Sequence, residues 1–143
     1  MSKPNPERRD RYSHFLAITT RWMDNDVYNH VNNVVYYSYF DTVVNEYMLR
    51  EKALSLAAGP VCLVVETGCQ YFSPISFPDA VTCGLRVAHL GLSSVRFEIG
   101  IFRNDELNAA AQGHFVHVCC DRDTHRPLAM PDPMRVALEK IRA

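Results

Sequence analysis

Hydrophobic residues along this chain follow two different periods. Between residues 34 and 50 they recur at helical spacing, which predicts one long helix with a single buried face. The segment is rich in β-branched and aromatic residues, so its intrinsic helix propensity is low and burial must stabilise it. The apolar positions of the helix are Tyr36, Phe40, Val43 and Tyr47, and its polar positions are Ser38, Asp41, Thr42 and Asn45.

Elsewhere the period is close to two, which predicts strands. We expect them over residues 12–22, 61–71, 80–89, 95–101 and 108–120, followed by a short terminal helix over 133–142. In the second of these strands, alternation places Val61, Leu63, Val65, Cys69 and Tyr71 on one face. Turn residues such as Ser73-Pro74 and Asn104-Asp105 separate the later strands by short connections, which force antiparallel neighbours.

This order of elements predicts an α+β domain. One antiparallel sheet of five to six strands would wrap around the long central helix. We expect a single domain over residues 12–143 and a flexible leader over residues 1–11, which are polar and contain two prolines. Long strands with exposed edges favour pairing between subunits, so we expect a homodimer or homotetramer.

Composition narrows the function classes. The net charge of −1 argues against nucleic acid as a partner, because such proteins present a basic face. The chain has five cysteines, an odd number, without a Cys-x-x-Cys pair, which indicates free thiols in a reducing compartment. No apolar run is long enough for a membrane span and no segment resembles a signal peptide, so we expect a cytoplasmic protein.

The most informative chemistry lies in residues 21–33. This segment places Asp24, Asp26 and His30 in a turn-rich loop directly before the long helix. A carboxylate beside a helix N-terminus can attack a carbonyl carbon or activate water, while the exposed N–H groups of the helix polarise the carbonyl oxygen. Asn32 or Asn33 is expected to cap the helix.

The same residues carry a family resemblance. The motif Asp24-x-Asp26-x-x-x-His30-Val31-Asn32-Asn33, followed by the aromatic run 36–40, resembles the acyl-CoA thioesterases of the 4-hydroxybenzoyl-CoA thioesterase type, in the hotdog-fold superfamily. Residues 70–75 and 90–98 resemble the family's second strand with its turn and its fourth strand. The similarity covers roughly residues 14 to 130 and implies the hotdog fold.

The resemblance also implies a reaction and a site. It implies hydrolysis of an acyl-CoA to free acid and coenzyme A, with water as co-substrate and no cofactor. Asp26 would be the nucleophile or the general base, and the backbone N–H of Asn33 would bind the thioester oxygen. His30 would have a supporting role, and the residues expected to bind substrate are Tyr36, Gly91, Ser93 and Ser94.

Several alternatives remain open at this level. Asp24 and His30 are equally compatible with a structural role in the loop, and Ser93 and Ser94 with a plain turn. The family often has glycine before the histidine, where this chain has Asn29, a residue that tolerates positive φ. A metal site over the loop would lack ligands, so we expect no metal. The alternative functions are hydrolysis of acyl-carrier-protein thioesters and non-catalytic binding of acyl-CoA or lipid, with a hotdog dehydratase as a weaker rival.

Overall fold

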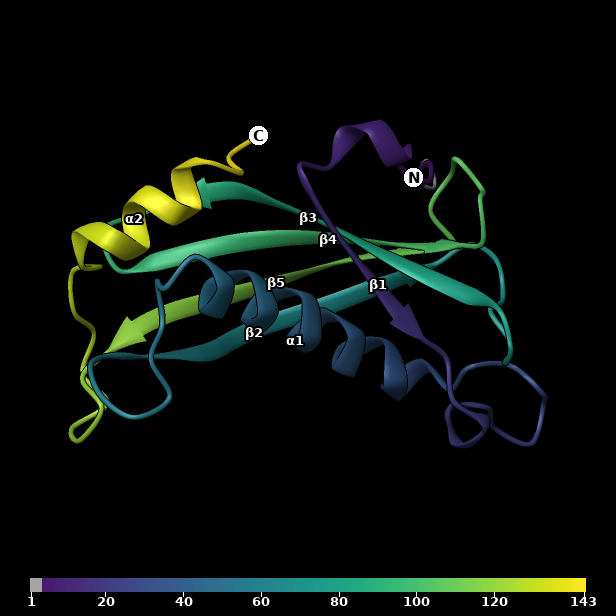
Figure 1. The fold of residues 1–143 in the computed structure, drawn as a ribbon, viewed down its shortest axis with the longest axis horizontal. Helices are drawn as coiled ribbons and strands as arrows, with labels where there is room; N and C mark the ends of the chain where they lie inside the picture. The colour runs from purple at the N-terminus through teal and green to yellow at the C-terminus, as the bar shows by residue number, and fades with distance from the viewer. Residues whose placement is uncertain (1–3) are drawn as a thin grey trace.

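A long helix lies against one face of a five-stranded antiparallel sheet in the computed structural model, which describes residues 4–143 (Figure 1). The strands are β1 (His14–Thr19), β2 (Val61–Tyr71), β3 (Ala80–Leu90), β4 (Ser94–Arg103) and β5 (Ala111–Cys120). The helices are α1 (Asn33–Arg50) and α2 (Asp132–Glu139), with short 3-10 turns at Arg9–Arg11 and Trp22–Asp24. The strand order is β1-β3-β4-β5-β2, so β1 and β2 form the two edges. The α+β expectation is confirmed, with five strands.

Helix α1 buries the face that the sequence pattern predicts. Phe40 and Val43 have no exposed surface, and Tyr36 and Tyr47 are also buried. Asn32 is the N-cap, and its side-chain oxygen accepts a hydrogen bond of 3.0 Å from the N–H of Val34. The helix is therefore held by the sheet on one side and by a capped start, which offsets its low propensity.

The core lies between the sheet and the two helices. The inner face of β4 contributes Val95, Phe97, Ile99 and Ile101, all nearly inaccessible to water. Helix α2 closes one end of this core with Met134 and Leu138. The two helices α1 and α2 thus cover one face of the sheet, and within residues 4–143 no α-helix covers the opposite face (Figure 1).

Strand β2 contains a bulge that changes which side chains face the core. The register with β5 shifts between Val64 and Glu66. Before the shift, Cys62 lies opposite Cys119, a core residue, so Val61 and Leu63 point to the outer face. The expectation that Val61, Leu63, Val65, Cys69 and Tyr71 share one face is therefore wrong, because an inserted residue inverts the alternation.

Part of the segment that we expected to be a leader lies against the sheet. The N–H of Glu7 donates to the side chain of Gln112 at 2.8 Å, and the N–H of Ala109 donates to the carbonyl of Glu7 at 2.9 Å. Tyr12 then packs on the outer face, where a Cβ on Gly100 would lie 2.7 Å from its ring. Residues 1–3 of the expected leader lie outside the described residues.

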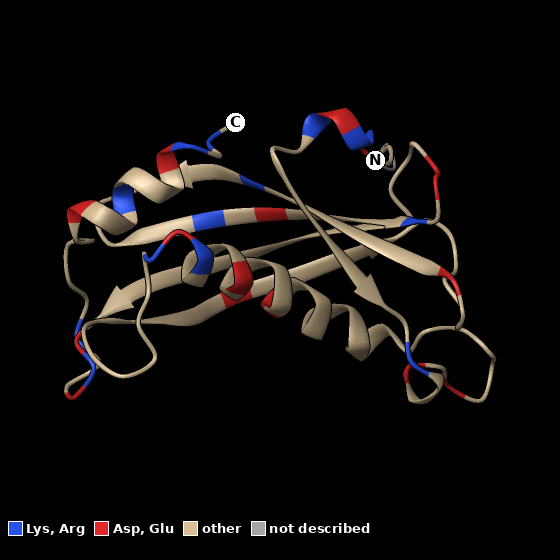
Figure 2. Cartoon of the chain, viewed as in Figure 1, with Lys and Arg blue, Asp and Glu red and all other residues tan. Residues whose placement is uncertain are grey.

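Charged side chains of both signs are mixed along the chain, in keeping with the net charge of −1 (Figure 2). None of the helices within residues 4–143 combines the length and the apolar character that a membrane span requires.

Candidate active site

The loop between β1 and α1 is built around Asp24. Its carboxylate is buried and accepts hydrogen bonds from the hydroxyl of Tyr39 (2.8 Å), and from the backbone N–H (3.0 Å) and Nε (3.0 Å) of Arg21. Burial opposes ionisation of Asp24, but these hydrogen bonds and the charge of Arg21 outweigh it, so the pKa of Asp24 is lowered. Asp24 therefore ties the loop to helix α1 and does not line the cavity described below.

Asp26 lies in the tight turn that follows. Its Oδ1 accepts a hydrogen bond of 2.8 Å from the N–H of Tyr28, which fixes the carboxylate in an Asx-turn. Its own N–H donates to the carbonyl of His30 at 2.9 Å, and the N–H of Asn29 donates back to Asp26 at 3.0 Å. Asn29 has a φ of 64°, so the turn requires the positive φ that asparagine tolerates.

The start of α1 leaves one backbone donor open. Asn32 accepts hydrogen bonds from two N–H groups in the first turn of the helix. Its side chain accepts from the N–H of Val34, and its carbonyl accepts from the N–H of Val35 at 2.9 Å. Asn33 is the first helical residue, and within residues 4–143 its N–H has no hydrogen-bond acceptor. This N–H is available to a ligand at the positive end of the helix dipole.

Asp26, His30 and Asn33 line one open cavity of about 450 Å³. Its walls are largely aromatic: Tyr36 and Tyr71 pack edge to face with ring centroids 5.0 Å apart. The hydroxyl of Tyr71 donates to the carbonyl of Asn33 at 3.1 Å, and so fixes the helix start. Burial raises the pKa of Tyr36 to about 12, so its phenol stays neutral near pH 7. A carboxylate, a free N–H and an apolar wall thus share one space.

The expected substrate-binding turn lies elsewhere in the chain. Gly91, Ser93 and Ser94 connect β3 to β4 next to α2, at the other end of the molecule from the loop before α1 (Figure 1). Arg135 of α2 holds this turn by donating to the carbonyl of Gly91 at 2.7 Å. A single chain therefore brings Asp26, His30, Asn33 and Tyr36 together but not these three residues.

The structure adds lining residues that the sequence reading did not assign. Phe72, Ser73 and Pro74 follow β2 and form the far wall of the cavity, and Tyr28 lies beside Asp26. The Ser73-Pro74 turn was visible in the sequence, but its position opposite the start of α1 depends on the pairing of β2 with β5 at the sheet edge.

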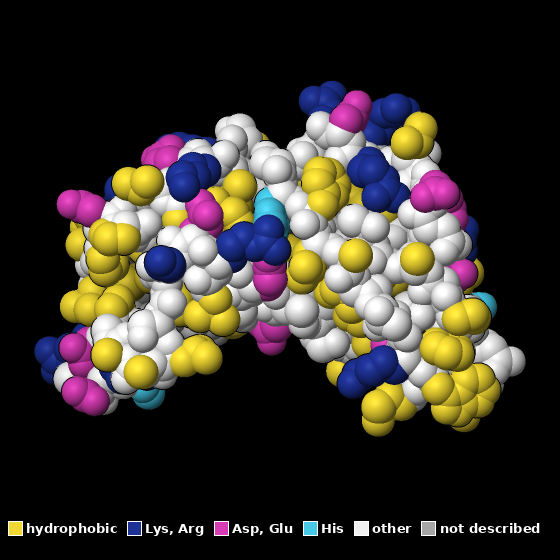
Figure 3. All heavy atoms as spheres, in the orientation of Figure 1, with side chains coloured by type: hydrophobic (Ala, Val, Ile, Leu, Met, Phe, Trp, Pro, Cys, Tyr) yellow, Lys and Arg dark blue, Asp and Glu magenta, His cyan; other side chains and the backbone are white. Residues whose placement is uncertain are grey.

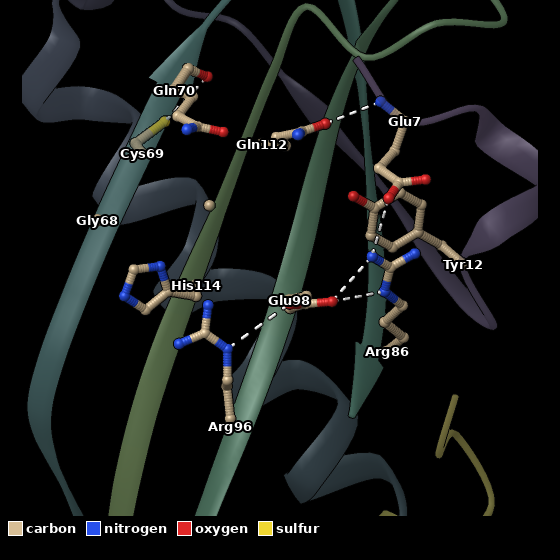
Figure 4. Close-up of a pocket in the computed structure, with 11 residues that line it drawn as sticks. Glu7, Tyr12, Gly68, Cys69, Gln70, Arg86, Arg96, Glu98, Gln112 and His114 are labelled. Atoms are coloured by element: carbon tan, nitrogen blue, oxygen red, sulfur yellow. Dashed lines mark hydrogen bonds and ion pairs between the residues drawn. The ribbon is translucent and has the colours of Figure 1, made fainter. Parts of the chain in front are cut away.

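A second cavity of about 450 Å³ lies on the outer face of the sheet, in front of the strands in Figure 4. Its charged groups satisfy one another: Arg86 donates to Glu98 at 2.9 Å and also contacts Glu7 at 3.4 Å, while Arg96 pairs with Glu98 at 3.6 Å.

No group of three or more His, Cys, Asp or Glu side chains suited to a metal ion occurs in the part of the chain that the structure describes.

Comparison with known proteins gives a family and several structural neighbours. Residues 20–138 match the model of the thioesterase-like superfamily. The PA5185 protein from Pseudomonas aeruginosa is 46% identical, with a TM-score of 0.94 and 98% of each chain covered. A thioesterase from Thermus thermophilus, solved with coenzyme A and zinc, is 28% identical, with a TM-score of 0.73 over 89% of this chain and 92% of that one.

A 1,4-dihydroxy-2-naphthoyl-CoA thioesterase from Synechocystis has the same fold. Its TM-score is 0.79, at 16% identity, over 87% of this chain and 93% of that one. A comparison with curated proteins gave no match.

Proposed function

Because the chain belongs to the thioesterase-like superfamily, we propose that it hydrolyses the thioester of an acyl-CoA to the free acid and coenzyme A. The observation that carries this proposal is the shared cavity, in which the carboxylate of Asp26 and the open N–H of Asn33 meet an aromatic wall. A thioester needs these groups: a base or nucleophile, a donor for the developing oxyanion, and an apolar space for the acyl chain. The coenzyme A bound to the Thermus thermophilus relative supports this substrate class.

In the proposed reaction Asp26 acts in one of two ways. As a general base it removes a proton from water, which attacks the thioester carbon; as a nucleophile it attacks that carbon itself and forms an anhydride, which water then hydrolyses. In both cases negative charge develops on the carbonyl oxygen beside the N–H of Asn33. The sulfur of coenzyme A leaves as a thiolate and is protonated. His30 lines the same cavity and would contact the thioester.

We also propose that the working form is a homodimer built on strand β2. One edge of β2 pairs with β5, and its other edge has no strand partner among residues 4–143. Val64 and Val65 on this strand are 46% and 61% exposed. An unpaired edge of this length invites pairing with a second copy.

Exposed apolar residues beside the cavity support the dimer. Apolar side chains gather at the end of the molecule that holds the loop before α1 (Figure 3). Within that loop Trp22, Val27 and Tyr28 are 77%, 90% and 78% exposed. A second copy would cover them, and only another copy can bring Gly91, Ser93 and Ser94 to a substrate bound at Asp26. Sedimentation equilibrium is expected to give twice the chain mass of 16.3 kDa; a monomer would contradict the proposal.

The test of the proposed reaction is thiol release from a panel of short, long and aromatic acyl-CoA esters. We expect turnover of at least one ester, and a loss of at least about a hundredfold in Asp26→Ala. Asp123→Ala is the matched control, because Asp123 is an exposed carboxylate in the turn after β5, at the other end of the molecule from the loop before α1 (Figure 1). Equal rates in parent and Asp26→Ala would refute the role of Asp26. A folded parent protein that hydrolyses no CoA ester would refute the substrate class and favour carrier-protein thioesters or ligand binding.

A further inference from the structure

Two of the five cysteines lie directly opposite each other across neighbouring strands. Cys62, near the start of β2, and Cys119, near the end of β5, are paired in the antiparallel register. Residues paired in this way share one face of the sheet. Here it is the core face, where Cys119 is buried and Cys62 is half-buried. The Sγ atom of Cys62 lies 4.0 Å from the Sδ atom of Met134 in α2.

The backbone hydrogen bonds show which kind of pair this is. The N–H of Cys119 donates to the carbonyl of Ser93 at 2.7 Å, and its carbonyl accepts from Leu128 at 2.8 Å. Both groups therefore point away from β2, and Cys62 and Cys119 form a non-hydrogen-bonded pair. In such pairs the Cα atoms are roughly 4.5 Å apart and the side chains approach closely. Disulfides require Cα separations of about 4.4–6.8 Å, so the two strands already hold a permissive spacing.

We propose that Cys62 and Cys119 are a redox modification site, oxidised to a cross-strand disulfide by a small disulfide such as oxidised glutathione. Cys62, the more exposed thiol, loses its proton and attacks a sulfur of the oxidant, which forms a mixed disulfide and releases one glutathione. Cys119 then loses its proton and attacks the sulfur of Cys62, which releases the second glutathione. Two protein thiols are oxidised and one glutathione disulfide is reduced to two thiols.

The environment of the pair sets the rate of this reaction. Burial raises the pKa of Cys62 to about 12 and also raises the pKa of Cys119, so few thiolates are present near pH 7. Because the thiolate is the attacking species, oxidation is slow at neutral pH and accelerates as the pH rises. The reduced form, with both thiols free, is therefore kinetically protected near neutral pH.

The disulfide would fasten the sheet edge without reaching the reaction cavity. It would join the start of β2 to β5, whereas the cavity is lined by Tyr71 at the other end of β2. The bond would close a loop of 57 positions (119 minus 62) and restrict the unfolded chain. We therefore expect the melting temperature to rise by at least about 5 °C. Formation of this disulfide is measured by thiol counts and by the melting temperature, so it does not depend on the proposed thioesterase activity.

The experiment oxidises the folded, full-length protein with glutathione disulfide at alkaline pH, then counts free thiols after denaturation. We expect five thiols to fall to three, a Cys62–Cys119 peptide in a non-reducing digest, and a higher melting temperature that dithiothreitol reverses. Cys62→Ser and Cys119→Ala each abolish the linked peptide. Cys120→Ser is the matched control and retains it, because Cys120 is adjacent in sequence but points to the opposite face.

Three results would overturn the proposal: a link that uses Cys120 or Cys69, a link between two chains, or a stable mixed disulfide at Cys62 without closure. If Cys119→Ala does not fold, Cys62→Ser alone decides the question, since Cys62 is only half-buried and serine is close to isosteric.

Discussion

His117 makes the stability of this protein sensitive to mild acid. Its side chain is only 4% exposed and packs between Phe97 and Phe115, with ring centroids 5.2 and 5.6 Å away. Its Nε2 has no hydrogen-bond partner among residues 4–143. Burial lowers the pKa of His117 from an ordinary 6.5 to about 4. In the unfolded chain this histidine is therefore protonated below about pH 6.5, whereas in the native chain it is protonated only below about pH 4. The neutral imidazole therefore contributes its full stabilisation above pH 6.5, the pKa of histidine in the unfolded chain. This stabilisation is lost as the pH falls towards about 4, the pKa of His117 in the native chain.

The size of the effect follows from the two pKa values. The full difference corresponds to about 3 kcal/mol of unfolding free energy, of which about 2 kcal/mol is lost between pH 7 and pH 5. His117→Leu fills the same apolar space and removes the proton-binding site. Between pH 7 and pH 5, the unfolding free energy of this variant should therefore decrease by about 2 kcal/mol less than that of the parent.

The assay is urea unfolding followed by circular dichroism at several pH values between about 5 and 7.5, at one protein concentration. Because all other titrating groups are common to both proteins, the difference between the two curves isolates His117. His89→Gln, at an exposed histidine, is the control and should reproduce the parent profile. Parallel pH profiles for parent and His117→Leu would refute the reasoning.

Three further changes test the site and the assembly. Asn33→Pro deletes the open N–H at the first helical position, where proline is tolerated and Asn32 already has a compatible ψ of 138°; kcat should fall by about a hundredfold, while Asn33→Ala, which keeps the N–H, should stay near the parent rate. Asp24→Ala leaves the buried hydroxyl of Tyr39 without its acceptor and should cost about 3 kcal/mol in urea unfolding; a loss below about 0.5 kcal/mol would contradict an anchoring role. Val64→Pro should block pairing at the free edge of β2 and shift sedimentation towards the monomer, whereas Val64→Thr should not; an unchanged dimer in Val64→Pro would place the interface elsewhere.

Local patterns in the sequence were sufficient to predict most of the elements. The helical spacing of Tyr36, Phe40, Val43 and Tyr47 predicted helix α1 and its buried face, and both are confirmed. The prediction failed where one inserted residue changed the geometry. The bulge between Val64 and Glu66 inverts the faces of β2, and alternation in a sequence cannot reveal it because it depends on the register with β5.

The sequence predicted the features of the loop before α1 only in part. The sequence indicated that Asp24, Asp26 and His30 precede a helix start, and that Asn29 tolerates the positive φ that the turn requires. Residue type and spacing did not separate the two carboxylates, and only the family resemblance assigned the catalytic role to Asp26. In the structure Asp24 is buried against Tyr39 and Arg21, while Asp26 lines the cavity. Burial is a property of the packed chain, so residue type and spacing left both roles open.

The sequence by itself determined the kinds of element, their order and the residue types available for chemistry, because helical and strand periods and capping residues are local properties. Only the tertiary structure decided which of these residues share a space. Tyr71 reaches the start of α1 across 38 positions of sequence, and Gly91, Ser93 and Ser94 are held at the opposite end of the sheet. These distances follow from strand order, which is set by how the whole chain buries its apolar surface and not by any single segment.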